Sequence, residues 1–445
     1  MNLRTLLYTL AVCVLCFVSV SSASAQSSTA YAITHAKIFT VSGAPIEDGT
    51  LLIRDGKIAA VGASVEVPAD AKVIDGKGLQ VYPGLFDAIT QMGLSEISAV
   101  SATVDSSETG PYNPDVVAAT AVSPSSEHIP VTRAAGITEV LAVPGSGGFD
   151  FSGSRGVIGG QASAIHLAGW TINEMLLKKS VAMVLTWPQI ETRTFDFATF
   201  SRKEKPYTEA KQEYDKQIAE LTDLLDRARH YALAVEHEKA ADFRRDVKFE
   251  ALVPVVRGQL PLLVVADGAR EIRNAVEYAD KYNLKIIIAG GGQAYKVKDL
   301  LRSKSVPVIL RPPLALPSEE DDPYDRLLTQ PAELANAGVK FAIASFDNSF
   351  ARRLGQNAAN AVAHGLPYEE GLKSVTLYPA QILGLADQVG TLETGKVANV
   401  IVTNGDPLEL TTDVRYLFIR GQFTSRDNKH QRLYEKYLNR PKSTE

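Results

Sequence analysis

The sequence predicts an α/β protein: a parallel barrel of the (β/α)8, or TIM, type, with a small β-sandwich built from both ends of the chain. Three observations predict it. Short apolar segments alternate with helical segments through the central part of the chain, which is the pattern of a parallel barrel. Segments rich in short strands flank that part, at 30–82 and 386–425. The length of 445 residues suffices for one large barrel, expected over 83–385, and a smaller appended domain.

The first 25 residues have the features of a secretory signal peptide. Arg4 precedes an apolar run from 6 to 20, and Ala23-Ser24-Ala25 gives the small-x-small pattern of a cleavage site. The apolar run is short for a membrane-spanning helix, which needs about 20 apolar residues. We therefore expect cleavage after Ala25 and a periplasmic or secreted mature protein that does not remain attached to a membrane.

The composition is typical of a soluble globular protein, with 45% hydrophobic residues, 22% charged residues and a formal net charge of −5. The chain lacks a long basic run, which argues against nucleic acid or an anionic membrane surface as a partner. Its two cysteines, Cys13 and Cys16, lie in the predicted signal peptide. We therefore expect the mature protein to use neither a thiol nucleophile nor a thiolate-bound metal.

The flanking segments contain the strands of the expected sandwich. Apolar or alternating stretches predict strands at 36–41, 50–54, 57–62, 73–74, 79–82, 416–419 and 422–424. Asp55-Gly56 predicts a tight hairpin between the second and third of these strands. The charged segment 426–445 predicts a terminal helix followed by a frayed tail.

The central part contains the elements of the barrel. Strands are expected at 138–143, 164–167, 181–186, 262–265, 285–289, 307–310 and 339–345. Helices are expected at 270–282, 295–303, 330–337, 350–364 and 368–374. From Tyr207 to Lys239 apolar residues recur at helical spacing, which predicts one long amphipathic helix packed on the barrel.

The segment 81–93, VYPGLFDAITQMG, is predicted to begin the barrel. A turn at Pro83-Gly84 leads into a short buried strand. This segment resembles the first barrel strand of the amidohydrolase superfamily, where Pro-Gly-Leu-Ile-Asp-Ala precedes His-x-His. The segments 49–58 and 389–402 resemble the two halves of the small β-domain of that superfamily, with Asn399 in place of an aspartate. The resemblance covers nearly the whole mature chain and is closest to imidazolonepropionase-like, metal-dependent hydrolases of non-peptide carbon–nitrogen bonds.

The resemblance implies a set of metal ligands, and this chain lacks most of them. In the superfamily one or two metal ions polarise water, held by His-x-His, a strand-four lysine or glutamate, histidines on strands five and six, and a strand-eight aspartate that also acts as a base. The His-x-His positions, which point to one face of the strand, hold Ile89 and Gln91. Val265 stands at the strand-five position, and 289–292 are all small residues on strand six. Asp347 matches the strand-eight aspartate.

We therefore predict a catalytically inactive member, a pseudoenzyme, that acts as a binding or partner subunit. Catalytic zinc generally needs three protein ligands, so we expect no resident metal or other cofactor; zinc or another divalent metal would bind only at a rebuilt site. Gln91, Asp267 and Asn348 are the candidates for binding a small molecule at the barrel mouth. The alternative is an active hydrolase with an atypical site that uses Asp347 as its catalytic residue. A homo-oligomer and a heteromer with an intact paralogue are both open.

Several polar features have a structural interpretation that we favour over a functional one. His166, on a predicted strand, is the best candidate for a rebuilt metal ligand, but core histidines are commoner. Asp347 can cap the helix that follows it. Gly290–Gly292 is a glycine-rich turn that could approach an anion, and the acidic segment 319–325 is expected to be a solvated loop and not a calcium site. The glycine-rich segment 145–160 predicts a flap over the barrel mouth.

Overall fold

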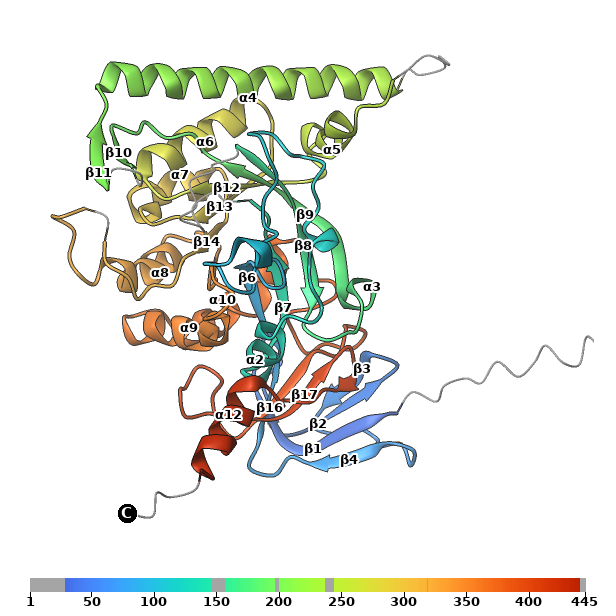
Figure 1. Ribbon diagram of the computed structural model, residues 1–445. Helices are drawn as coiled ribbons and strands as arrows, with labels where there is room; N and C mark the ends of the chain where they lie inside the picture. The colour runs from blue at the N-terminus through green and yellow to red at the C-terminus, as the bar shows by residue number, and fades with distance from the viewer. Residues whose placement is uncertain (1–28, 146–156, 197–199, 237–243, 318, 441–445) are drawn as a thin grey trace, which may run out of the picture.

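The computed structural model describes residues 29–145, 157–196, 200–236, 244–317 and 319–440, so the predicted signal peptide lies outside the described residues. Two eight-stranded sheets organise this part of the chain, and the hairpin of β10 (Arg193–Asp196) and β11 (Ser201–Glu204) adds a third, smaller sheet. One large sheet forms the barrel and the other forms the small domain, which lies at the lower end of the molecule in Figure 1.

The barrel sheet confirms the predicted α/β fold with an eight-stranded barrel. Its strands, in spatial order, are β6 (Leu85–Thr90), β7 (Ile137–Ala142), β8 (Ile158–His166), β9 (Leu176–Thr186), β12 (Leu262–Ala266), β13 (Ile286–Gly290), β14 (Val308–Leu310) and β15 (Phe341–Ile343). The backbone N–H of Phe346, after β15, donates to the carbonyl of Ile89 in β6 at 3.0 Å. The last strand therefore meets the first, and the barrel is nearly closed.

One strand departs from the all-parallel barrel that the sequence predicts. β8 runs antiparallel to both of its neighbours, β7 and β9, whereas the other strands run parallel to one another. The connection from β8 to β9 consists of residues 167–175 and contains only the one-turn helix α3 (Ile172–Met175). A parallel crossover needs a dozen or more residues, so this short connection forces the chain to reverse.

Helices cover the outside of the barrel. They are α2 (His128–Ala134), α4 (Tyr207–Glu236), α5 (Val247–Val256), α6 (Ala269–Lys281), α7 (Lys298–Ser303), α8 (Arg326–Asn336), α9 (Leu354–Ala363), α10 (Tyr368–Ser374) and α11 (Leu377–Ile382). The predicted long helix is α4, which lies at the end of the molecule opposite the small domain (Figure 1). Among the described residues, none of the helices combines the length and the apolar character that a membrane span requires.

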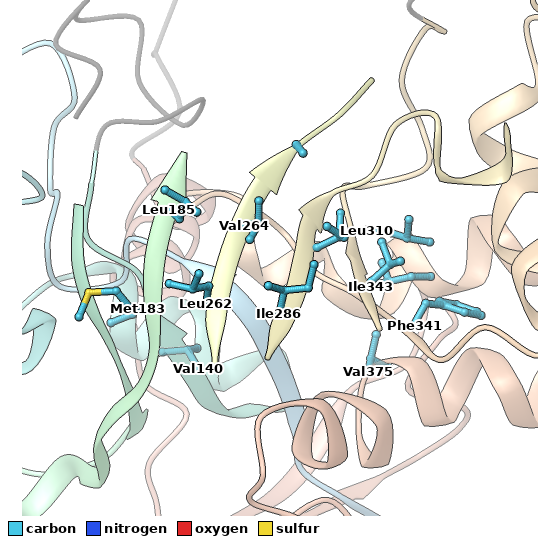
Figure 2. Close-up of a cluster of buried hydrophobic side chains, with 14 of the residues drawn as sticks. Val140, Met183, Leu185, Leu262, Val264, Ile286, Leu310, Phe341, Ile343 and Val375 are labelled. Atoms are coloured by element: carbon cyan, nitrogen blue, oxygen red, sulfur yellow. The ribbon is translucent and has the colours of Figure 1, made fainter. Parts of the chain in front are cut away.

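The strands bury both of their faces because the barrel has an apolar interior and an apolar outer surface. Met183, Leu262, Val264 and Ile286 belong to the cluster beneath the helices, and Figure 2 shows such side chains on neighbouring strands. The residues that alternate with these along the strands, such as Leu263, form a second buried cluster inside the barrel. Strands that are buried on both faces are typical of parallel sheets, and they explain the continuous apolar runs in the sequence.

The small domain joins the two ends of the chain in one sheet. Its strands are β1 (Tyr31–Ile38), β2 (Ile46–Arg54), β3 (Lys57–Gly62), β4 (Lys72–Asp75), β5 (Gln80–Pro83), β16 (Val400–Thr403), β17 (Val414–Ile419) and β18 (Gln422–Phe423). The antiparallel pair of β5 and β16 connects the amino-terminal strands to the carboxyl-terminal ones. That these strands form a two-layered sandwich stays a prediction. The helix α12 (Lys429–Leu438) follows β18.

Two local features of this sheet account for one prediction that is confirmed and one that is wrong. Asp55 and Gly56 both have positive φ angles, 53° and 77°, as a type I′ hairpin requires, so the predicted hairpin is confirmed. The first strand begins at Tyr31, five residues before the predicted start. His35 has a φ of 55° and lies where the β1–β2 register shifts, so a bulge at the polar Thr34-His35 pair interrupts the alternation in this strand.

Gly84, in the predicted turn, marks where the first barrel strand approaches the second. A Cβ atom at this position would lie 1.8 Å from Oγ1 of Thr138, in β7. A side chain at position 84 would therefore force these two strands apart, so glycine is needed here for the close packing of the strands.

Candidate functional site at the barrel mouth

The barrel mouth is the rim formed by the carboxyl ends of the parallel strands, and the positions at which the resemblance implies histidines converge there. Ile89, Val265 and Ala289 are at most 5% exposed and belong to one buried apolar cluster. None of these side chains has an atom that can bind a metal. Within the described ranges, no three His, Cys, Asp or Glu side chains lie close enough together to hold a metal ion. The residues at the mouth therefore do not fit a resident metal.

Gln91, a predicted ligand-binding residue, lies in the turn that follows β6. Its backbone carbonyl accepts hydrogen bonds from the N–H groups of Leu94, at 2.9 Å, and Ser95, at 3.3 Å. Its side-chain Nε2 is buried and has no hydrogen-bond partner. A buried amide without a partner is uncommon and costs free energy, so Gln91 has a donor that an external acceptor could satisfy.

Asp347 accepts hydrogen bonds from the chain that follows β15. Its Oδ1 accepts from the N–H groups of Ser349, at 2.6 Å, and Phe350, at 2.8 Å. Its backbone carbonyl accepts from Oγ1 of Thr90, at 2.9 Å, and from Oγ of Ser345, at 2.8 Å. The carboxylate thus satisfies two N–H groups in the bend that precedes the short helix Ala351–Arg353, whose own N-cap residue, Phe350, makes no side-chain cap bond. That Asp347 serves as a helix cap stays a prediction.

Asn348, the second predicted binding residue, ties two loops together. Its Nδ2 donates to the carbonyl of Ser95, in the loop after β6, and its Oδ1 accepts from Oγ of Ser349 at 3.3 Å. The structure therefore brings Gln91, Asp347 and Asn348 to the side of the mouth where the barrel closes. Asp267 lies on another side of the mouth, with β12 to β14.

Asp87 is a buried carboxyl group whose role the sequence did not reveal. Its side chain is fully buried, Oδ1 accepts from the N–H of Ser345 at 3.0 Å, and Oδ2 accepts from the Ser345 hydroxyl. Burial raises the pKa of the Asp87 carboxyl to about 7, and the nearby charge of Asp347 acts in the same direction. Asp87 thus links the first barrel strand to the segment that follows the last one. The available signal was a charged residue within an otherwise apolar strand.

Asp267 pairs with an arginine across strand six. Nη2 of Arg311, which follows β14, lies 3.2 Å from Oδ2 of Asp267, and Nε lies 3.3 Å from Oδ1. The guanidinium group also stacks on the ring of Phe346, 4.6 Å from the ring centroid. A Cβ at Gly290, the end of β13, would lie 2.5 Å from Oδ1 of Asp267. The small residues that replace a histidine on strand six therefore leave room for this ion pair.

The other predicted features at the mouth have protein partners. The N–H of Gly291 donates to the carbonyl of Ala266, and the N–H of Gly292 donates to Oδ1 of Asp267, so this turn is used internally and does not present these amides to an anion. In the acidic loop, Glu319 accepts from Nε2 of Gln293, and Asp322 accepts from the hydroxyl of Tyr295. Of the predicted flap, residues 146–156 lie outside the described residues.

His166 lies at the opposite end of the barrel, next to the small domain. It is 3% exposed, and its Nδ1 lies 3.0 Å from Nδ2 of Asn399. The same Nδ2 donates to Oε1 of Glu139, which is 1% exposed. Burial raises the pKa of the Glu139 carboxyl to about 7 and lowers the pKa of the His166 imidazole to about 3. His166 is thus a hydrogen-bonded core histidine, as favoured above.

The fold and the rim of polar residues define the class: an α/β-barrel protein whose candidate site lies at the carboxyl ends of the strands. The Amidohydrolase family model matches residues 328–424. The amidohydrolase tasK of Hapsidospora irregularis is 26% identical over 391 residues, which are 81% of this chain and 38% of that protein. This chain therefore spans well under half the length of that curated relative.

Solved structures point to the same family. The amidohydrolase from Thermotoga maritima MSB8 superposes with a TM-score of 0.76 and 25% identity, over 89% of this chain and 100% of that one. Molinate hydrolase, at 14% identity and a TM-score of 0.55 over 94% and 99% of the two chains, shares the fold. The family model, the curated relative and the solved structures all support the amidohydrolase superfamily as the one that this chain resembles.

Proposed function

We propose that this chain is a non-catalytic member of the superfamily, exported from the cytoplasm, that acts as a small-molecule binding protein or as the partner subunit of an intact amidohydrolase. The observation that supports this is the apolar cluster of Ile89, Val265 and Ala289 at the positions of the family histidines. An ion placed there would lose its hydration and gain no protein donors in exchange, which is strongly unfavourable. A resident metal or other cofactor is not part of the proposal.

The alternative is an active hydrolase that works with Asp347, and one observation favours it. Asp87, two strand positions before Ile89, has a pKa of about 7, which suits a general base at neutral pH. Its carboxyl group is completely buried and bonded to Ser345, however, so it cannot reach a substrate in this conformation. Asp347 is likewise engaged by two backbone N–H groups.

The first experiment measures metal content. The purified mature protein is incubated with zinc, manganese or ferrous iron, desalted and analysed by mass spectrometry for metals, beside an amidohydrolase with an intact His-x-His motif. We expect the control to retain stoichiometric metal and this chain to retain only traces, because it lacks the three ligands that such sites need. Stoichiometric metal in this chain after desalting would overturn the proposal.

The second experiment separates the two roles of Asp347. Asp347→Asn keeps an Oδ1 acceptor for the N–H groups of Ser349 and Phe350, so we expect its stability to stay within about 0.5 kcal/mol of the parent. Asp347→Ala removes this acceptor and should cost about 0.5–2 kcal/mol. Both are measured by urea unfolding. An amide-hydrolysing activity that Asp347→Asn abolishes at unchanged stability contradicts the non-catalytic proposal and supports the alternative.

The partner form of the proposal is supported by the relation to tasK. In that relative the matched region is part of a much longer chain, since this chain covers 38% of it. A barrel that works beside further sequence in one protein can also work beside a separate subunit in another. Homo-oligomerisation remains the second form of assembly.

A further inference from the structure

A cavity of about 250 Å³ opens on the rim of the barrel, between β13, β14 and α8. Its outer wall is formed by the strap, residues 311–317 (RPPLALP), which connects β14 toward α8. Leu316 of the strap and Leu327 and Pro331 of α8 contribute apolar surface. The charged groups in the wall are Asp267 and Arg311. Ligand sites are typically apolar clefts with a few placed polar groups, and drug-sized ligands occupy about 300–1,000 Å³, so this cavity suits a smaller molecule.

We propose that this cavity binds a small zwitterion with an apolar body, such as a free α-amino acid with an aliphatic side chain. The inference rests on the proposed function, since it names the ligand class of a non-catalytic barrel. The carboxylate of the ligand pairs with the Arg311 guanidinium and its ammonium group pairs with Asp267. The aliphatic side chain packs against the leucines and prolines of the strap and α8.

The geometry of the ion pair favours an exchangeable contact. The separations between Arg311 and Asp267 are 3.2–3.4 Å, longer than the roughly 2.7–2.9 Å of a tight charge-assisted hydrogen bond. The two side chains are 32% and 41% exposed, so a ligand reaches them from the cavity. Stacking on Phe346 holds the guanidinium in place while its carboxylate partner is exchanged. A receptor that is fixed before binding loses less entropy on binding.

Charge balance selects a zwitterion over a simple anion or cation. A ligand with a carboxylate alone would draw Arg311 away from Asp267. The Asp267 carboxylate would then keep the hydrogen bond from the N–H of Gly292, at 3.3 Å, but lose its positively charged partner. An amine alone would occupy Asp267 and take this carboxylate from Arg311. Breaking an ion pair at a partly buried site is costly, and a ligand with both charges replaces the group that it displaces at each residue.

The test is isothermal titration of the full mature chain with L-leucine. We expect saturable one-to-one binding. L-leucinamide, which lacks the carboxylate, and 4-methylpentanoate, which lacks the amine, should each bind about tenfold or more weakly, because each displaces one member of the ion pair without replacing it. Failure of L-leucine to bind at millimolar concentration overturns the inference, and so does equal affinity for 4-methylpentanoate.

Variants locate the site. Arg311→Gln should weaken L-leucine binding about 10- to 100-fold, since it removes a charge-assisted hydrogen bond. Leu316→Ser should weaken it about fivefold, because it removes apolar contact area. Leu314→Ser is the matched control: it is a leucine on the same strap, 71% exposed against 85% for Leu316, but it does not line the cavity. Its affinity should equal that of the parent.

The outcomes are separable from those of the proposed function. Thermal unfolding shows whether Arg311→Gln is folded. If Arg311→Gln does not fold, Leu316→Ser still tests the site, because Leu316 lies on the surface and its substitution should leave the fold intact. L-leucine binding that neither variant weakens places the ligand elsewhere and overturns the inference. Metal content and amide hydrolysis decide the non-catalytic proposal independently, so a chain that binds neither metal nor L-leucine would refute only the inference about the cavity.

Discussion

Replacing Asn399 with leucine is expected to lower the free energy of unfolding by about 3–5 kcal/mol, the cost of breaking a buried charged or hydrogen-bonded network from one side. Nδ2 of Asn399 donates to Oε1 of Glu139 and lies 3.0 Å from Nδ1 of His166, and its Oδ1 accepts from the N–H of Arg420 at 2.7 Å. Leucine has a similar size but offers none of these contacts. Three polar groups at the junction of the barrel and the small domain would then lose a partner.

Urea unfolding followed by circular dichroism measures the effect. Asn404→Leu is the matched control, because Asn404 is exposed and its side-chain Oδ1 accepts a single hydrogen bond, from the N–H of Asp413. We expect this control to cost less than about 1 kcal/mol, the ordinary range for one exposed hydrogen bond. If the two variants lose stability equally, the buried network does not contribute the stability assigned to it.

The sequence could not predict this network, although it singled out Asn399 and His166. Asn399 and Glu139 are 260 residues apart in the chain, and Glu139 faces His166 only because β8 runs antiparallel to β7. The apolar run that predicts β8 carries no information on strand direction. That direction follows from a short connection, and connection length is clear only when the start of β9 is known.

At the barrel mouth, the sequence predicted only those residues whose direction follows from the alternation of side chains along a strand. Ile89 and Val265 could be placed at the site because strand periodicity and the resemblance give their facing, and the structure brings both into one cluster. Arg311 was missed, since the resemblance implies no arginine there and its pairing with Asp267 crosses a third strand. Asp87 was missed because no pattern in the sequence shows that a strand-one carboxyl meets Ser345, just after the last strand.

Glu139→Gln is expected to change how stability depends on pH. Burial raises the pKa of the Glu139 carboxyl from an ordinary 4.5 to about 7, so the folded state retains a proton that the unfolded state releases. The stability contributed by this proton is complete below pH 4.5 and is lost as the pH rises through 7. Glutamine is the neutral isostere: its amide can donate to the oxygen of Thr138 while its carbonyl accepts from Asn399. The Glu139→Gln variant therefore does not lose this stability as the pH rises.

The difference in unfolding free energy between the variant and the parent should shift by about 1.4 kcal/mol per pH unit between pH 5 and 7, or about 3 kcal/mol over the window, in favour of the variant at the higher pH. Urea unfolding of both proteins at several pH values measures it. Parallel curves for the two proteins would show that Glu139 does not titrate in this window.

The parent curve alone cannot isolate this term, because two other buried groups titrate in the same range. Asp87, with its pKa raised from 3.8 to about 7, loses stability in the same direction as Glu139 when the pH rises. His166, with its pKa lowered from 6.5 to about 3, acts in the opposite direction, since the unfolded chain binds a proton that the buried imidazole refuses. Between pH 4.5 and 6.5 these two contributions offset each other. The Glu139→Gln variant should therefore be nearly independent of pH there, while the parent falls steadily.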